Sequence, residues 1–227
     1  MNLVLDLGNS RCKWALSDSS LKPGGAFAYG ENFARTLDHA LGKFARPTQV
    51  AAASVAGAAL TDKLAQWVKH HWSLDLMCFG ARPAQCGVTN TYKDPAQLGA
   101  DRWAALIAAR ARVSGAACVV DCGTAVTVDA LDAGGAFRGG VILPGLALMR
   151  AALLLRTQGV SAVEGDTGSV LAHTTADGVA AGTLFSLAGA IDRILDEQAT
   201  ALGDAPQVLL TGGDAPAVQA LLRHTTH

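Results

Sequence analysis

The sequence predicts an α/β protein made of two related halves, each with a mixed β-sheet covered by helices. An apolar run ends at Asp6 and is followed by Gly8 and small polar residues, and the same order recurs at Asp121 and Gly123. A Gly-Gly-Ala-Phe segment then follows each of these runs. Two halves that begin with the same β-hairpin and third strand indicate a duplicated domain, with chance similarity between short β segments as the alternative.

Hydrophobic spacing and turn residues define the elements of the first half. The expected elements are strands over 2–7, 11–17 and, after a turn at Pro23-Gly24, 25–29, a helix over 31–44, a strand over 49–55, a helix over 58–72 and a strand over 74–79. After a loop, Asp94 and Pro95 predict the start of a long helix ending near Val113, because Asp caps helices and Pro suits their first position. This helix would link two domains, 1–114 and 115–227.

The second half repeats the pattern of the first. The expected elements are three strands between 116 and 143, a helix over 146–155, a loop over 158–168, a helix over 174–202, a strand over 207–210 and a helix over 216–222. Each half therefore has the order βββαβα. Within the long helix, Gly178, Gly182 and Gly189 would let another backbone approach closely, either within the chain or across a dimer.

Composition and charge narrow the class of protein. The net charge is −1 and there is no basic run, so nothing predicts binding to nucleic acid or to an anionic membrane. No apolar run reaches the roughly 18 residues of a transmembrane span, and Met1 leads straight into a strand, so we expect a cytoplasmic protein. The five cysteines lack the spacing of a zinc site and are expected to be reduced thiols.

The two Asp-Gly hairpins carry chemistry that suits a nucleoside triphosphate. A carboxylate at a strand end can hold a hydrated cation, and a glycine turn can offer N–H groups to phosphate oxygens. Two related hairpins that face each other across a cleft would fit such a ligand. Taken alone, Asp6 could instead cap its own turn, and Lys13 could be a solvated lysine on a strand.

Five short motifs occur in order along the chain. They are Asp6-x-Gly8-Asn9-Ser10-x-x-Lys13, Leu98-Gly99-Ala100-Asp101-Arg102, Asp121-x-Gly123-Thr124-Ala125-x-Thr127, Gly139-Gly140-x-Ile142-x-Pro144-Gly145 and Thr211-Gly212-Gly213-Asp214-Ala215. Together they closely resemble the type III pantothenate kinases of the acetate and sugar kinase/Hsp70/actin superfamily, over essentially the whole chain. The resemblance implies duplicated actin-like (ribonuclease H-like) βββαβα domains with a central cleft.

The resemblance also implies an activity. The family phosphorylates pantothenate with ATP to 4'-phosphopantothenate, the first step of coenzyme A synthesis, as a homodimer in the cytosol. Its members need Mg²⁺ or another divalent cation, and some also use a monovalent cation, K⁺ or NH₄⁺. The alternatives are another small-molecule kinase of the superfamily and a regulatory protein that keeps the fold, since some family members are described as accessory factors for transcription.

By this resemblance, Asp101 is the catalytic base that takes the proton of the acceptor hydroxyl. The residues implied in ATP binding are Asp6, Leu7, Gly8, Asn9, Ser10, Arg11, Cys12, Lys13, Thr124, Gly212 and Gly213. The residues implied in pantothenate binding are Tyr92, Gly99, Ala100, Asp101, Arg102 and Thr175. Asp121 would approach the monovalent cation, and Asp6 would organise Mg²⁺ through water.

Some of these assignments have alternatives. Taken alone, Asp101 reads as an acidic residue that favours the helix dipole or pairs with Arg102. The family's usual Asn-Thr pair is Thr174-Thr175 in this sequence, so Thr174 is the alternative to Thr175 in contacting the substrate. Ser10 stands where Thr is common in the family, and it keeps the hydroxyl group.

Overall fold

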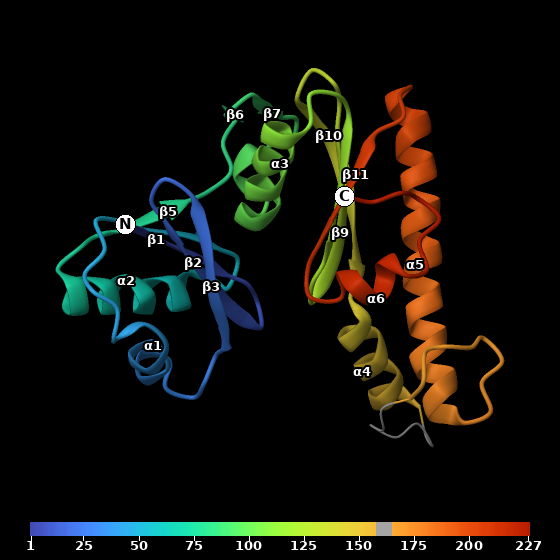
Figure 1. The fold of residues 1–227 in the computed structure, drawn as a ribbon, viewed down its shortest axis with the longest axis horizontal. Helices are drawn as coiled ribbons and strands as arrows, with labels where there is room; N and C mark the ends of the chain where they lie inside the picture. The colour runs from blue at the N-terminus through green and yellow to red at the C-terminus, as the bar shows by residue number, and fades with distance from the viewer. Residues whose placement is uncertain (158–164) are drawn as a thin grey trace. The chain divides into compact units, whose positions relative to one another are not determined.

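The computed structural model describes residues 1–157 and 165–227. These residues form two compact units (Figure 1). Unit 1 comprises residues 1–82 and 92–104, and unit 2 comprises residues 83–91 and 105–227. Each unit has its own sheet and core, as expected for a duplicated α/β fold. A single domain boundary after residue 114 stays a prediction.

The sheet of unit 1 has the mixed topology that the sequence predicts. Its strands are β1 (Asn2–Leu7), β2 (Arg11–Ser17), β3 (Leu21–Ala28), β4 (Val50–Ser54) and β5 (Leu76–Phe79). They lie in the order β3-β2-β1-β4-β5, with β1, β2 and β3 antiparallel and β1, β4 and β5 parallel. The carboxyl ends of β1, β4 and β5 therefore meet at one edge, where binding sites of α/β sheets form.

Two helices cover one face of this sheet (Figure 1), α1 (Phe33–Leu41) and α2 (Ala58–Trp72). Their apolar residues share a core with Leu3, Leu5 and Leu7 of β1. Because side chains alternate along a strand, Val4 and Asp6 point to the other face of the sheet. The predicted range of α2 is confirmed at both ends, whereas α1 is shorter than expected and begins where the Asn32 side chain accepts the Arg35 N–H.

The turn expected at Pro23-Gly24 is wrong. The chain turns earlier, where the Asp18 carboxylate accepts hydrogen bonds from the Ser20 N–H and from Lys22 Nζ, both at 3.2 Å. Strand β3 consequently begins at Leu21 and runs through the Pro-Gly pair. A side chain at Gly24 would meet the ring of Trp14 on the neighbouring strand, with its Cβ 2.0 Å from Trp14 Cε3, so glycine there serves packing rather than turning.

The long helix expected from Asp94 is also wrong at its start. Asp94 Oδ1 does accept the Ala96 N–H at 3.1 Å, but it caps only the short 3₁₀-helix η1 (Pro95–Gln97). Leu98 then adopts an extended conformation, and the α-helix α3 (Ala100–Arg112) begins after this break. Asp101 therefore lies in the first turn of a helix, not in its interior.

The sheet of unit 2 repeats the first arrangement and extends it. Its strands are β6 (Ala84–Gln85), β7 (Val88–Asn90), β8 (Ala117–Cys122), β9 (Ala125–Leu131), β10 (Ala136–Pro144) and β11 (Gln207–Thr211). They lie in the order β11-β8-β9-β10-β7-β6, with β8, β9 and β10 antiparallel and β11 parallel to β8. The β6–β7 hairpin was expected to be a loop. Its strand β7 pairs in parallel with β10, and the Thr89 N–H donates to the O atom of Gly135, just before β10, at 2.9 Å.

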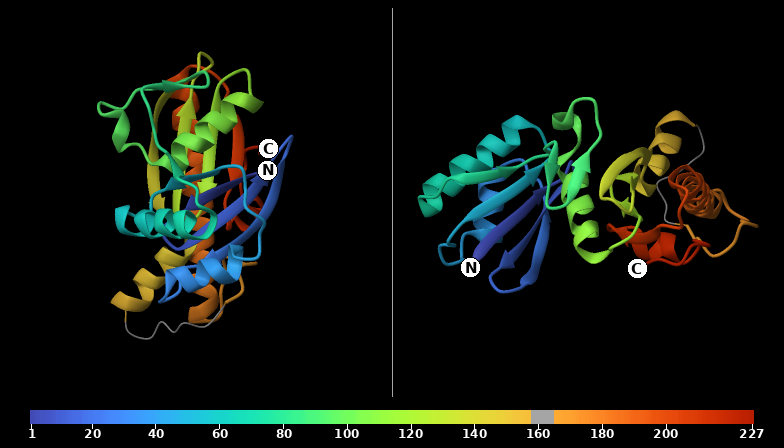
Figure 2. Two further views of the ribbon diagram at one scale, coloured as in Figure 1. Left: turned by 90° about the vertical axis from the view of Figure 1, so that its left-hand side faces the viewer. Right: turned by 90° about the horizontal axis from the view of Figure 1, so that it is seen from above.

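The helices of unit 2 are α4 (Leu146–Arg156), α5 (Thr175–Leu202) and α6 (Ala215–Gln219). Figure 2 (right) views α5 nearly end-on beside the strands, and its Leu184, Leu187, Ile191 and Leu195 share a core with β8 and β9. By length and composition α5 could cross a membrane, but half of its most apolar window is buried within the structure, as in the core helix of a soluble protein. Residues 158–164 of the expected loop lie outside the described residues.

The five cysteines are all free thiols, as the sequence predicts. Cys12, Cys118 and Cys122 are buried, and burial raises the pKa of each to about 12. Cys78 and Cys86 are exposed. The three buried thiols therefore stay protonated and unreactive at neutral pH.

Candidate active site

The first predicted hairpin is formed by β1 and β2. Asp6 and Lys13 lie opposite each other in the pairing, and Lys13 Nζ is 3.8 Å from Asp6 Oδ2. The Gly8 N–H donates to Arg11 O at 3.1 Å and closes the turn, leaving Asn9 and Ser10 exposed at its tip. The hairpin thus presents a carboxylate, an ammonium group and a small polar turn at the carboxyl edge of the sheet.

Asp6 is electrostatically coupled to the predicted base. Burial raises the pKa of Asp6, Lys13 lowers it, and the negative charge of Asp101 raises it again. Unit 1 therefore brings together Asp6 and Asp101, which are 95 positions apart in the sequence (101 − 6). Two neighbouring carboxylates that repel each other form an arrangement that a cation stabilises.

The start of α3 explains the Gly-Ala-Asp-Arg motif. Asp101 Oδ1 accepts the backbone N–H of Arg102 at 2.7 Å, while Oδ2 has no hydrogen-bond partner within residues 1–157 and 165–227. A Cβ atom at Gly99 would lie 2.5 Å from Asp101 Oδ1, so a larger residue would displace the carboxylate. Glycine at 99 is thus required by the position of the Asp101 side chain.

Arg102 and Tyr92 form a pair beside Asp101. Arg102 Nη1 donates to the Tyr92 hydroxyl at 3.0 Å, and its guanidinium carbon lies 5.9 Å from the ring centroid. Arg102 is only 8% exposed, so it is held in place rather than free in solvent. The structure therefore gathers Tyr92, Gly99, Asp101 and Arg102, all predicted to contact the acceptor substrate.

A largely apolar groove of about 670 Å³ runs along the sheet face opposite α1 and α2. Its lining includes Val4, Asp6 and Lys13 of the hairpin and Ala104 of α3. Residues three apart on a helix share a face, so Asp101 lies on the same side of α3 as Ala104. Asp6 thus lies in the lining of the groove, and Asp101 lies one helical turn before Ala104 on α3. A small molecule with apolar and polar parts would fit such a groove.

The second predicted hairpin lies in unit 2, between β8 and β9. Asp121 pairs with Thr127 across it, and the Gly123 N–H donates to Ala125 O at 3.2 Å to close the turn. The Gly145 N–H at the start of α4 donates to Thr124 O at 3.0 Å, and a Cβ at Gly145 would come within 2.2 Å of Gly123 O. The helix start is therefore packed directly onto the hairpin turn.

The predicted Gly212-Gly213 turn packs against the same hairpin. Gly212 has φ +103°, and a Cβ there would lie 2.4 Å from the backbone of Cys122. The Asp214 N–H donates to Cys122 O at 3.0 Å. A Cβ at Gly213 would instead meet open space. Gly212 is thus required by the fold, whereas Gly213 leaves a flat surface without a side chain.

The two threonines at the start of α5 differ in their hydrogen bonds. The Thr174 hydroxyl accepts the Asp177 N–H at 3.1 Å and donates to Asp177 Oδ2 at 2.7 Å, so it caps the helix. Thr175 is the first helical residue and is exposed. The capping role of Thr174 favours Thr175 as the threonine available to a ligand.

Sequence reasoning missed Tyr29. Its hydroxyl donates to the backbone carbonyl of Gly8, in the turn of the first hairpin, at 2.7 Å. The two residues are 21 positions apart, and no motif links them. The one available signal is that the protein has only two tyrosines, Tyr29 and Tyr92, and both lie beside predicted site residues.

The carboxylates of the site suit a hydrated cation rather than a metal ion bound entirely by protein side chains. Within the described part of the chain, no group of three or more His, Cys, Asp or Glu side chains is arranged to hold a metal ion. Asp6 offers carboxylate oxygens at the hairpin, with Asp101 nearby. Mg²⁺ is bound in many kinases by one or two carboxylates together with water and substrate phosphates, so the residues fit a metal that arrives with the nucleotide.

Comparison with solved structures shows the fold. The chain is similar to a protein from Campylobacter jejuni described as a Baf family transcriptional activator, with 22% identity, a TM-score of 0.60 and coverage of 99% of this chain and 89% of that one. It is also similar to the activator of 2-hydroxyisocaproyl-CoA dehydratase from Clostridium difficile, with bound ADPNP, at 13% identity and a TM-score of 0.51, covering 99% and 87%. The duplicated actin-like fold is confirmed.

Comparison of sequences identifies the family. A sequence model of type III pantothenate kinase matches residues 2–197. The type III pantothenate kinases of Nitrosococcus oceani and Alkalilimnicola ehrlichii are each 39% identical to the chain, covering 98% and 97% of it and 87% and 89% of their own lengths. The chain therefore belongs to the type III pantothenate kinase family and catalyses that family's reaction, the ATP-dependent phosphorylation of pantothenate in coenzyme A synthesis.

Proposed function

We propose that Asp101 is the general base that accepts the proton of the pantothenate hydroxyl. The proposal rests on the different hydrogen bonding of the two carboxylate oxygens of Asp101. Oδ1 is anchored by the Arg102 N–H at 2.7 Å, and Oδ2 has no partner in the described ranges. One oxygen thus orients the carboxylate while the other is available to the acceptor hydroxyl.

The acceptor binds beside Asp101, in the groove along the sheet of unit 1. The apolar wall suits the dimethyl-bearing part of pantothenate, and the guanidinium of Arg102 and the hydroxyl of Tyr92 suit its oxygen atoms. Gly99, which is half-buried and has no side chain, lies next to the Asp101 carboxylate. Positioning of this kind, rather than covalent chemistry by the protein, supplies most of the rate in phosphoryl transfer.

The β1–β2 hairpin binds the phosphates of ATP. Residues 7–12 supply the turn and its flanks, Lys13 supplies positive charge, and Asp6 holds the divalent cation through water. When bound, that cation neutralises charge on the phosphates. Asp6 and Lys13 keep each other oriented across the hairpin at 3.8 Å.

Unit 2 carries the other residues that the family resemblance implies in nucleotide and cation binding. Thr124 in the β8–β9 turn contacts phosphate, and Asp121 approaches a monovalent cation, K⁺ or NH₄⁺. The purine lies against the flat turn of Gly212 and Gly213, where the absence of side chains lets a ring approach the backbone.

The working unit is a cytoplasmic homodimer. The motivating feature is α5, on which Gly178, Gly182 and Gly189 are exposed. A Cβ at Gly182 or Gly189 would meet no atom of another element within 4 Å among residues 1–157 and 165–227, so these glycines are not packed against the rest of the described chain. A second backbone at this face would bring Thr175 of one chain to the substrate of the other, and both sites would form together by twofold symmetry.

The base is tested with Asp101→Asn, which keeps the shape of the side chain and removes proton acceptance. Turnover with ATP and pantothenate should fall by roughly 10²–10⁴ while the melting temperature is retained. Near wild-type turnover at saturating substrates would rule out the role of Asp101.

The shared site is tested by mixing two inactive variants, Asp101→Asn and Thr175→Ala, under conditions in which subunits exchange. In a heterodimer one site carries both lesions and the other carries neither, so activity should return to at most about half per dimer. No recovery despite proven exchange, or a fully active monomer in light scattering, would exclude it.

A further inference from the structure

Tyr29 lies directly behind the turn of the β1–β2 hairpin. It follows the last residue of β3, and its hydroxyl donates a hydrogen bond of 2.7 Å to Gly8 O. Its ring packs edge-to-face on Phe33, at the start of α1, with centroids 5.6 Å apart. The ring is therefore anchored by the core, and the hydroxyl reaches from that anchor to the backbone of the turn.

The phenol is a donor at every physiological pH. Burial raises the pKa of Tyr29, and the negative charge of Asp6 raises it further. The group stays protonated, so its hydrogen bond to the carbonyl of Gly8 persists over the working range of the enzyme. A neutral hydrogen bond of this length has normal geometry, and such a bond stabilises a folded protein by about 1 kcal/mol.

The hydrogen bond between Tyr29 and Gly8 O also fixes the direction of the N–H of Asn9. In a planar trans peptide the carbonyl of one residue and the N–H of the following residue point in opposite directions. Since Gly8 O points to Tyr29, the N–H of Asn9 points away from Tyr29, toward the exposed tip of the hairpin. A flipped peptide would instead place a carbonyl oxygen at the tip, where it would repel an anion.

We propose that Tyr29 is a positioning residue for phosphate binding, which holds the Gly8–Asn9 peptide with its N–H directed to the triphosphate. The inference rests on the proposed role of the hairpin in binding phosphates. It assigns the orientation of one phosphate-binding amide to a residue outside the hairpin, immediately after β3.

The test is Tyr29→Phe, which keeps the ring on Phe33 and removes only the hydroxyl. The KM for ATP should rise about fivefold, as for the loss of one hydrogen bond, while the KM for pantothenate stays within about twofold of wild type. Direct binding should show the same loss for ATP and no loss for adenosine, which has no phosphates. Thr61→Val, which removes a hydroxyl bonded to Ser54 and Gly57 in the same unit, should change neither constant.

Lys13→Met separates the inference from the proposed site on which it rests. If Lys13→Met weakens ATP binding and Tyr29→Phe does not, the hairpin binds phosphates without help from Tyr29 and the inference is wrong. Parallel rises in both KM values of Tyr29→Phe, or equal losses for ATP and adenosine, would also overturn it. If neither variant weakens ATP binding, the hairpin site itself is wrong and the inference falls with it.

Discussion

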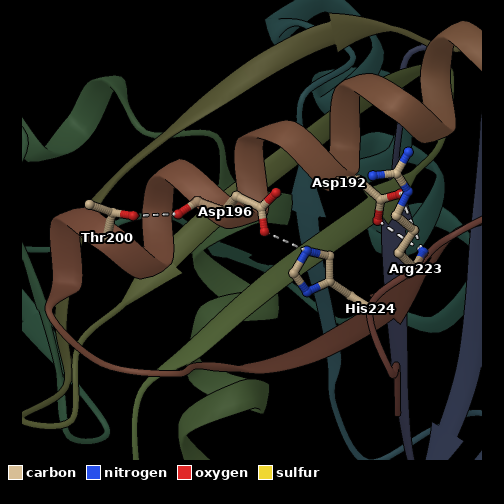
Figure 3. A network of polar contacts seen from close by, with 5 residues as sticks. All are labelled: Asp192, Asp196, Thr200, Arg223 and His224. Carbon is tan, nitrogen blue, oxygen red and sulfur yellow. Dashed lines mark hydrogen bonds and ion pairs between the residues drawn. The ribbon is translucent and has the colours of Figure 1, made fainter.

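The backbone N–H of Arg223 donates to both carboxylate oxygens of Asp192, at 3.1 and 3.2 Å (Figure 3). Asp192 lies on α5 and is 7% exposed, whereas the Arg223 side chain is 91% exposed. The guanidinium, with Nε 4.0 Å from the carboxylate, adds little because exposed ion pairs are weak. The buried carboxylate therefore recognises backbone, and it holds the last residues of the chain against α5.

These residues in turn pair with β11, because the His227 N–H donates to Val208 O at 2.9 Å. We predict that Asp192→Ala lowers the free energy of unfolding by about 1–3 kcal/mol, since it leaves a partly buried N–H without an acceptor. Urea denaturation measures this change. Asp196→Asn is the matched control, because the exposed contact between Asp196 and His224 at 3.2 Å should contribute less than about 1 kcal/mol. Equal effects of the two changes would contradict the argument.

The titration of Asp6 should respond in opposite directions to its two charged neighbours. Lys13 lowers the pKa of Asp6, so Lys13→Met should move it upward, and Asp101 raises it, so Asp101→Asn should move it downward. The carboxyl carbon of Asp6, followed by NMR against pH, measures both shifts. Identical titration in all three proteins would show that Asp6 is not coupled to these side chains.

The raised pKa of Asp6 has a defined sign for stability. A carboxyl group whose pKa is higher in the folded than in the unfolded state binds its proton more tightly when folded. Its contribution is present below the unfolded value and is lost as pH rises through the folded value. Asp6→Asn should therefore flatten the pH dependence of stability in the acidic range, which denaturation at several pH values detects.

Gly212 and Gly213 should behave differently when replaced by alanine. Gly212→Ala places a Cβ 2.4 Å from the Cys122 backbone in a conformation with φ +103°, and should destabilise the protein by about 2 kcal/mol or more. Gly213→Ala meets open space and should change stability by less than about 0.5 kcal/mol, while raising the KM for ATP. Thermal melts measure the change in stability, and kinetics measure the change in the KM for ATP. A wild-type KM for ATP in Gly213→Ala would contradict the proposed contact between the purine and this turn.

Asp121 should mediate a response to monovalent cations. At constant ionic strength, K⁺ or NH₄⁺ should increase turnover relative to Na⁺, because a carboxylate at the hairpin turn favours a bound cation. Asp121→Ala should flatten this response. Equal activity of the wild-type enzyme in Na⁺ and K⁺ would leave Asp121 with a structural role only.

The fold was predictable where local patterns agree with tertiary packing. The range of α2 follows from Leu64, Trp67 and Val68 on one face, and the same residues form its buried side. The pattern failed after Asp94, because the cap and proline are those of a helix start, whereas Gly99 must leave room for the Asp101 carboxylate and the helix breaks before it. A cap signals where a helix begins and not how long it runs.

Long-range contacts explain what sequence reasoning missed. The strands β6 and β7 have only two and three residues, and they exist because β7 pairs with β10 at Ala136 and Phe137. The hydrogen bond from Tyr29 to Gly8 likewise joins segments whose spacing carries no motif. By contrast, the grouping of Tyr92, Gly99 and Asp101 lies within ten positions and was expected.

The positions of the exposed thiols allow the unmodified chain to be labelled on both units. Cys78 belongs to unit 1 and Cys86 to unit 2, and both are exposed, whereas the other three cysteines are buried with raised pKa values. Because reagents such as maleimides attack thiolates, they will modify the exposed pair first. A donor and an acceptor dye, or two spin labels, can thus be attached with one probe on each unit and no engineered cysteine. The separation between the units then becomes measurable in solution, with and without nucleotide.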